Sequence, residues 1–132
     1  MLVRDGMSTV VLTVGPGQPL GAVAKAMTER GVGAAVVVDP DAPGPGIVTE
    51  RDILRAYAAD RVTADEPVRD HSTERAVFAS PDWSLERAAD EMVRGKFRHL
   101  IVIDGGEITG ILSIRDIVSC WARDGATSEM PA

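Results

Sequence analysis

The chain has 132 residues, of which 45% are hydrophobic and 26% are charged, as expected of a globular domain with a buried core. Its formal net charge is -6 and it has no cluster of Lys and Arg, which argues against a nucleic-acid-binding surface. No apolar run approaches the ~20 residues of a membrane-spanning helix, and the N-terminus has no signal-peptide pattern, so we expect a cytoplasmic protein without membrane contact.

The cysteine and histidine residues predict no metal site. Cys120 is the single cysteine, and with His71 and His99 it forms no ligand spacing such as CxxC or HExxH. On an apolar helix, we expect Cys120 to be buried and inert. The chain also has no nucleophile elbow, Ser/His/Asp order or Walker loop, so we expect no cofactor and no enzymatic activity.

The first half of the chain predicts the order β-α-β-β-α. Apolar residues at helical spacing follow Pro19 and end before Gly31, and a continuous apolar run follows, which is typical of a strand buried on both faces. The expected elements are a strand at 10–14, a helix at 19–30, strands at 34–38 and 47–48, and a helix at 50–59.

The second half repeats this order. The phrase from Gly46 to Asp52 returns 64 residues later as Gly110 to Asp116, and Val3-Arg4-Asp5 returns as Val68-Arg69-Asp70. The expected elements are a strand at 76–79, a helix at 83–94, strands at 100–103 and 108–112, and a helix at 114–123.

These repeats predict an α/β (α+β) fold. Two pseudo-symmetric β-α-β-β-α repeats, each too small to bury its own sheet, are expected to pack about a pseudo-twofold axis as one module. The expected organisation is repeat 1 at 3–60, a linker at 61–67, repeat 2 at 68–124 and a flexible tail at 125–132.

The repeated phrase lies on a strand-to-helix turn in both halves. Thr49 and Ser113 are followed three residues later by Asp52 and Asp116, which is the pattern of a capping box. The backbone N–H groups at a helix start favour an anion, and a neighbouring carboxylate can accept hydrogen bonds from hydroxyls. The alternative is that each aspartate only caps its helix and binds nothing.

The tandem β-α-β-β-α order and the twice-used turn motif resemble the cystathionine-β-synthase (CBS) domain family. The resemblance covers about residues 3–124 and includes the Val-Arg-Asp phrases and the stretch from Arg98 to Asp104. Paired CBS repeats are similar to sensors rather than catalysts, and they often bind AMP, ADP, ATP or S-adenosylmethionine in clefts between repeats. One departure is the absence of the proline that many members have in the second strand.

The resemblance implies a ligand site at each turn. Asp52 and Asp116 would hold the ribose hydroxyls, with Thr49 and Ser113 near the ribose or phosphate. The segments from Ser8 to Leu12 and from Thr73 to Val77 would complete the second and first site, respectively. The expected ligand-binding residues are Ser113, Arg115, Asp116, Arg98, His99, Thr49, Arg51, Asp52, Ile111, Ile47 and Thr9.

The two sites are expected to differ in charge. Arg98 and His99 precede the second apolar strand of repeat 2, where family members place a basic residue for phosphate, whereas repeat 1 has Gly33 and Ala34. Arg98 has the ordinary alternative of a solvated surface arginine, and His99 that of a strand-end imidazole without a function.

Two functions remain open on the sequence. The first is a regulatory module that senses an adenosine-containing ligand and acts on an unknown protein in trans, and the second is a structural homodimerisation module with no bound nucleotide. A homodimer is expected in both cases, because the last helix of each repeat carries an apolar face that includes Tyr57 or Trp121. Met27 and Met92 are expected to fill the core.

Overall fold

The structure, a computed structural model, describes residues 1–59, 64–73 and 76–124. The chain forms two compact units: unit 1 comprises Met1–Val10 and Val77–Ala132, and unit 2 comprises Val11–Ala76. Each unit therefore combines most of one sequence repeat with the first residues of the other. The predicted tail at 125–132 and residues 61–63 of the predicted linker lie outside the described residues.

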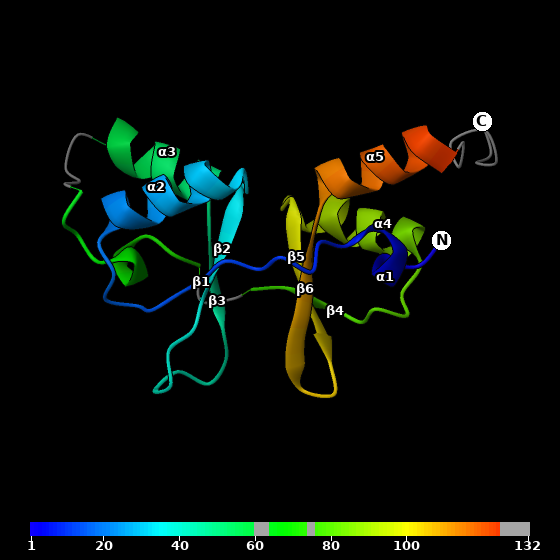
Figure 1. Ribbon diagram of the computed structural model, residues 1–132, viewed down its shortest axis with the longest axis horizontal. Coiled ribbons are helices and arrows are strands. Elements are labelled where there is room, and N and C mark those ends of the chain that lie inside the picture. The colour runs from blue at the N-terminus through cyan, green and yellow to red at the C-terminus, as the bar shows by residue number, and fades with distance from the viewer. Residues whose placement is uncertain (60–63, 74–75, 125–132) are drawn as a thin grey trace. The chain divides into compact units, whose positions relative to one another are not determined.

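Unit 2 consists of a three-stranded sheet and its helices. The strands are β1 (Thr13–Val14), β2 (Ala34–Val37) and β3 (Gly46–Thr49), and β2 pairs parallel to β1 and antiparallel to β3. The helices are α2 (Leu20–Arg30), α3 (Glu50–Ala58) and the short 3-10 helix η1 (Val68–Asp70). Figure 1 shows α2 and α3 next to each other, and α2 also contacts β2.

Unit 1 has the same architecture. Its strands are β4 (Phe78–Ala79), β5 (His99–Asp104) and β6 (Glu107–Ser113), and β5 pairs parallel to β4 and antiparallel to β6. Its helices are α1 (Val3–Gly6), α4 (Leu85–Gly95) and α5 (Ile114–Asp124). Gly105 and Gly106 join β5 to β6 with φ angles of 59° and 83°, a left-handed conformation that glycine adopts without steric cost.

The predicted α+β fold and the repeated β-α-β-β-α order are confirmed. The two long helices of each repeat begin within two residues of the predicted positions. In the strand predicted at 34–38, Ala34–Val37 is buried throughout, whereas Val38 lies beyond the strand and is 47% exposed. The first strand of each repeat is shorter than predicted, because only Thr13–Val14 and Phe78–Ala79 pair with a neighbouring strand. The short helices α1 and η1 were not predicted.

Each unit has its own hydrophobic core between sheet and helices. The core of unit 1 includes Leu85, Leu100 and Leu112, and that of unit 2 includes Leu20, Ala35 and Val48. All six side chains are 0% exposed. Burying a leucine or valine side chain contributes about 1.5–3 kcal/mol, so these residues are the main source of stability in each unit.

The repeated Val-Arg-Asp phrase anchors one repeat to the other within each unit. In unit 1, the Val3 N–H donates to the Trp83 carbonyl (2.7 Å) and the Arg4 N–H to the Pro81 carbonyl (3.1 Å). In unit 2, the Val68 and Arg69 N–H groups donate to the carbonyls of Gln18 (2.8 Å) and Pro16 (3.0 Å) in the same way. Both valines are 0% exposed, so the phrase acts as a structural anchor.

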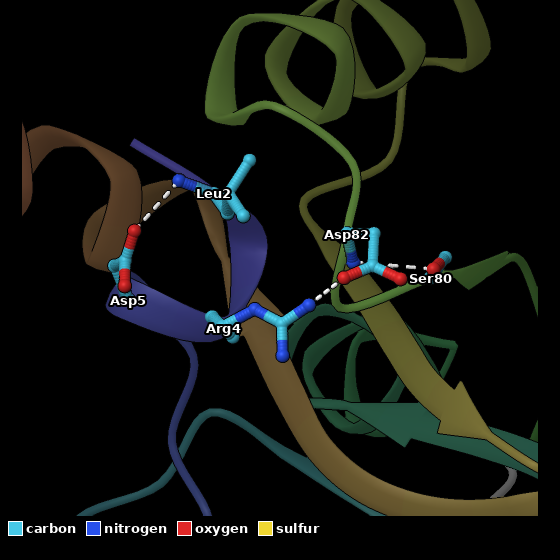
Figure 2. Close-up of polar contacts among 5 residues, drawn as sticks. All are labelled: Leu2, Arg4, Asp5, Ser80 and Asp82. Carbon is cyan, nitrogen blue, oxygen red and sulfur yellow. Dashed lines mark hydrogen bonds and ion pairs between the residues drawn. The ribbon is translucent and has the colours of Figure 1, made fainter.

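Side chains strengthen the anchor in unit 1. Figure 2 shows the ion pair between the Arg4 guanidinium and the Asp82 carboxylate, while the Leu2 N–H donates to Asp5 Oδ2 at 2.8 Å. The Asp82 N–H donates to Ser80 Oγ at 3.1 Å, which stabilises the turn whose carbonyls accept the Val3 and Arg4 N–H groups. The ion pair is exposed and contributes about 1 kcal/mol or less, so the buried valine is the stronger part of the anchor.

Within the described residues, none of the helices has both the length and the apolar character needed to cross a membrane.

Candidate functional site

The strand-to-helix turn of each unit forms the predicted capping box. At the start of α5, the Asp116 N–H donates to Ser113 Oγ (3.0 Å), and the Ser113 N–H donates to Asp116 Oδ2 (2.8 Å). At the start of α3, the same two bonds join Thr49 and Asp52 at 3.2 and 2.9 Å. The Thr49 hydroxyl also lies 3.0 Å from Asp52 Oδ2. Both aspartates therefore cap their helices, as the structural alternative predicted. Any contact with a ligand would be a second role of the same side chains.

The capping box leaves part of each carboxylate available. Asp116 and Asp52 are half-buried and use Oδ2 in the box, while Oδ1 accepts no hydrogen bond from the described part of the chain. An ionised carboxylate oxygen can accept more than one hydrogen bond. Each turn therefore presents one acceptor oxygen at a fixed position for a hydroxyl-bearing ligand.

Fewer helix N–H groups are available than the sequence predicts. The first N–H of α5, from Ile114, donates to the Arg98 carbonyl (2.9 Å), and that of α3, from Glu50, donates to the Gly33 carbonyl (2.9 Å). The third N–H is used by the capping box. The second one, from Arg115 or Arg51, has no acceptor within the described residues. Each turn thus offers an anion one backbone donor rather than three.

A segment from the other repeat crosses next to each turn. In unit 1, Ser8 and Ile111 exchange two backbone hydrogen bonds of 2.9 and 3.0 Å, and in unit 2 Thr73 and Ile47 do so at 2.8 and 3.0 Å. The segments expected at the two sites, from Ser8 and from Thr73, therefore lie beside β6 and β3 two residues before each N-cap. Ser8 Oγ accepts the Val10 N–H (3.2 Å), which places the exposed Thr9 between two fixed residues.

Glycine allows this crossing. A Cβ atom on Gly110 would lie 2.8 Å from the Ser8 carbonyl oxygen, and one on Gly46 would lie 3.0 Å from the Thr73 carbonyl oxygen. Real Cβ atoms essentially never approach another atom more closely than 3.0 Å. Gly110 is therefore needed for the close backbone approach, and at Gly46 a side chain would require the Thr73 carbonyl to shift slightly. The sequence does not reveal either requirement.

Basic side chains gather at the turn of unit 1. His99 is the Cα partner of Ser113 in the sheet, and Arg98 precedes it and is exposed. Arg115 is exposed at the second position of α5. In unit 2, the partner of Thr49 is Ala34, preceded by Gly33, so Arg51 is the cation of this turn among the described residues. The two turns thus differ in the basic residues beside them, as the sequence predicts.

The structure brings together the predicted residues of each unit. Unit 1 places Ser113, Asp116, His99, Ile111 and the segment containing Thr9 around one turn. Unit 2 places Thr49, Asp52 and Ile47 beside Thr73. Whether they bind a ligand remains a prediction. Sequence reasoning did not predict that the carbonyls of Arg98 and Gly33 accept the first N–H group of α5 and α3, because a backbone acceptor has no sequence signal.

The other predicted residues take mostly structural positions. Met27 and Met92 are buried, and Cys120 is 1% exposed with its Sγ accepting from Arg123 Nη2 at 3.5 Å. Trp121 packs against the unit 1 core, but its Nε1 is buried and has no hydrogen-bond partner within the described residues. Tyr57 is 45% exposed and is thus not a core residue. No group of three metal-ligating side chains was found where the structure describes the chain.

The family model of the CBS domain matches the chain twice, over residues 3–59 and 68–123. The CBS domain-containing protein YhcV of Bacillus subtilis is 32% identical over 129 residues, covering 97% of this chain and 91% of that protein. An uncharacterised 17.7 kDa protein of Acidianus ambivalens is 37% identical over 111 residues. The chain covers 66% of the Acidianus protein and 45% of a Methanocaldococcus jannaschii relative, so it spans less than two thirds of these relatives.

Solved structures of CBS-domain proteins are also similar to this chain. A putative signal-transduction protein with CBS domains from Burkholderia ambifaria has a TM-score of 0.83 at 31% identity, covering 92% of both chains. A CBS domain protein of Pyrobaculum aerophilum, solved in complex with AMP, has a TM-score of 0.79 at 29% identity, covering 93% of this chain and 99% of that one.

Proposed function

Because this chain belongs to the CBS-domain family, we propose that it is a regulatory module that binds an adenosine-containing ligand at the turn formed by Ser113 and Asp116. The observation that carries the proposal is the half-buried Asp116 carboxylate. The capping box fixes its orientation through Oδ2 and leaves Oδ1 without a described partner. The AMP complex of the Pyrobaculum relative supports the choice of ligand.

In this proposal, each chemical group of the ligand has a matching part of the turn. Asp116 Oδ1 accepts hydrogen bonds from the ribose hydroxyls. The Arg115 backbone N–H and the Arg98 and His99 side chains stabilise a phosphate, because a phosphate accepts charge-assisted hydrogen bonds. Ile111 and the backbone around Thr9 form the wall against which the base packs.

The proposal is tested by calorimetric titration of AMP into wild type and two matched variants, Asp116→Asn and Asp52→Asn. Asparagine keeps an oxygen that can accept the N-cap N–H, so the helix cap is retained while the carboxylate is lost. Asp116→Asn is expected to weaken AMP binding about tenfold or more, since a hydrogen bond to a charged group contributes about 1.5–3 kcal/mol. Asp52→Asn is expected to change it little.

A second comparison separates phosphate from nucleoside recognition. Arg98→Gln is expected to weaken AMP binding more than adenosine binding, because only AMP carries the group that Arg98 contacts. Equal losses of AMP affinity in the two aspartate variants would contradict the assignment to unit 1. A wild type that binds neither AMP, ADP, ATP nor S-adenosylmethionine would favour a structural module.

The regulatory role requires a partner. Paired repeats without a catalytic arrangement are expected to act on another protein in trans, and we propose a cytoplasmic protein target whose contact depends on ligand occupancy. Co-purification of a target that dissociates when AMP is added would support this part of the proposal. A ligand-binding protein whose target contact is insensitive to AMP would contradict it.

Structural homodimerisation is the second candidate function, and exposed apolar side chains favour it. Leu54 and Tyr57 on α3 are 70% and 45% exposed, and Val118 on α5 is 56% exposed. Leu54 and Tyr57 are three residues apart and therefore share one face of α3, and an exposed apolar face often marks a protein interface. We expect a homodimer by sedimentation, and Leu54→Glu is expected to produce monomers, whereas Val93→Glu, at the 72% exposed Val93 of α4, is not. A monomeric wild type at micromolar concentration would contradict this.

A further inference from the structure

Residues 1–9, here called the arm, belong to the first sequence repeat but pack in unit 1. The fully buried side chain of the arm is Val3, and Met7 packs partly buried against the same core. Where the arm ends, Val10 is 62% exposed, and residues 9–11 form no backbone–backbone hydrogen bond with another described segment. The arm is thus a short separate segment that unit 1 holds mainly through one side chain.

The corresponding segment of unit 2, residues 66–73, has an additional side-chain contact. Glu66 Oε1 and His71 Nε2 lie 3.1 Å apart, and their side chains are 32% and 19% exposed. Met1 and Gly6 take these two positions in the arm, and neither has a side chain that could form this contact. The arm of unit 1 is therefore held less firmly at its two ends.

The side-chain ion pair of the arm is exposed to water. The Arg4 and Asp82 side chains are 48% and 71% exposed, and an exposed ion pair contributes little and is weakened by salt (Figure 2). Docking also orders nine residues, which costs conformational entropy. We therefore expect the arm to open at a lower free energy than unit 1 as a whole.

The arm reaches the proposed ligand site at its last residues. Ser8 and Ile111 exchange two backbone hydrogen bonds of 2.9 and 3.0 Å, two residues before the N-cap Ser113. The exposed Thr9 follows, and its backbone belongs to the wall against which the base packs in the proposed function. A ligand between Thr9 and Asp116 contacts the arm and the turn at once, so it stabilises the docked arm by linkage.

From this arrangement we infer that the arm is a strap whose docking on unit 1 is coupled to ligand occupancy of the turn formed by Ser113 and Asp116. The inference rests on the proposed function, because it assumes a ligand at this turn. Without the ligand the arm opens more often, which withdraws Val3 from the core and uncovers the apolar residues beneath it. Ligand occupancy thereby controls a change of surface to which a protein target can respond.

Cys120 provides a probe for the opening of the arm. It is the single cysteine of the chain and is 1% exposed. A Cβ atom on Gly6 would lie 3.1 Å from Cys120 Sγ, and the Asp5 carbonyl oxygen lies 4.0 Å from this sulfur atom, so the end of α1 covers the thiol. A thiol reagent therefore reaches Cys120 after the arm has opened.

The first test is alkylation of the wild type by N-ethylmaleimide, followed by intact mass with and without AMP. AMP at about ten times its Kd is expected to slow alkylation about tenfold, because a ligand that binds only the docked arm lowers the open population by this factor. In Asp116→Asn, the same AMP concentration is expected to have little effect. Hydrogen exchange without AMP is expected to be faster over residues 1–9 than over 99–113.

The second test opens the arm and then locks it. Val3→Ala is expected to raise the apparent Kd for AMP about threefold or more, because the open form does not bind, whereas the matched change Val68→Ala in unit 2 is not. Adding Gly6→Cys to Val3→Ala places a thiol beside Cys120, since 3.1 Å is close to the about 3 Å between Cβ and the opposite Sγ of a disulfide. The oxidised protein is expected to bind AMP like wild type, and the reduced protein like Val3→Ala.

The outcomes distinguish this inference from the proposed function. If wild type binds AMP but AMP does not slow alkylation, or if residues 1–9 exchange no faster than 99–113, the inference is wrong and the proposed function stands. Equal AMP affinities of the oxidised and reduced forms of the locked variant would also contradict the inference. If wild type binds neither AMP nor S-adenosylmethionine, both are wrong.

Discussion

Val3→Asp is expected to unfold unit 1, although Val3 belongs to the first sequence repeat and unit 1 consists mainly of the second. The Val3 side chain is 0% exposed in the cluster that contains Leu85 and Leu112, and its N–H donates to the Trp83 carbonyl. Burying an unpaired carboxylate costs several kcal/mol, which is a large part of a total stability of about 5–15 kcal/mol.

Hydrogen exchange measured by mass spectrometry tests this prediction, because it reports each unit separately. Val3→Asp is expected to speed exchange over residues 77–124 and much less over 11–59. The matched variant Val68→Asp should have the opposite effect, because Val68 is 0% exposed in the core of unit 2. Faster hydrogen exchange only in the sequence repeat that carries the mutation would contradict this account, in which the first residues of each repeat pack in the unit of the other repeat.

Gly110→Ala is expected to destabilise the protein by about 1–3 kcal/mol, the usual cost of overpacking a tight site. Its Cβ would lie 2.8 Å from both the Ser8 carbonyl oxygen and Met7 Sδ. The methionine can move, but the Ser8 carbonyl is held by the Ile111 N–H at 3.0 Å. The clash is therefore relieved only by moving the crossing segment away from β6.

Urea unfolding compares this variant with Gly44→Ala. A Cβ atom on Gly44 would meet no other atom within 4 Å, and Gly44 has no left-handed φ. Alanine at position 44 is therefore expected to be neutral, or to stabilise the protein by about 0.4–1 kcal/mol because it lowers the conformational entropy of the unfolded chain. Gly46→Ala, at 3.0 Å from the Thr73 carbonyl oxygen, should resemble Gly110→Ala in a milder form. Equal stability of the Gly110 and Gly44 variants would contradict the proposed role of Gly110.

Local patterns were sufficient to predict the two long helices and the two longer strands of each repeat, together with the capping boxes. Helical spacing ahead of Gly31, the apolar run of β2 and the Ser113/Asp116 spacing each depend on residues close in sequence, and the structure confirms them. The equivalence of the two turns was also visible, because the phrase at Gly110 repeats the one at Gly46.

Long-range contacts were less accessible to sequence reasoning. The Val-Arg-Asp recurrence was evident, but its purpose depends on carbonyls of Trp83 and Pro81 that lie far away in the chain. The number of helix N–H groups available to an anion is also set by a distant contact, because the Arg98 carbonyl accepts the Ile114 N–H. The resemblance to a known family did indicate the neighbourhood of Ser8, which periodicity alone would not have placed beside Ile111.

A crystal structure of the protein grown with saturating AMP tests the central claim most directly. We expect AMP at the turn of unit 1, with the ribose hydroxyls within hydrogen-bonding distance of Asp116 Oδ1 and the phosphate beside Arg98. AMP bound where Asp116 does not contact it, or a turn without AMP at a saturating concentration, would contradict the proposed function.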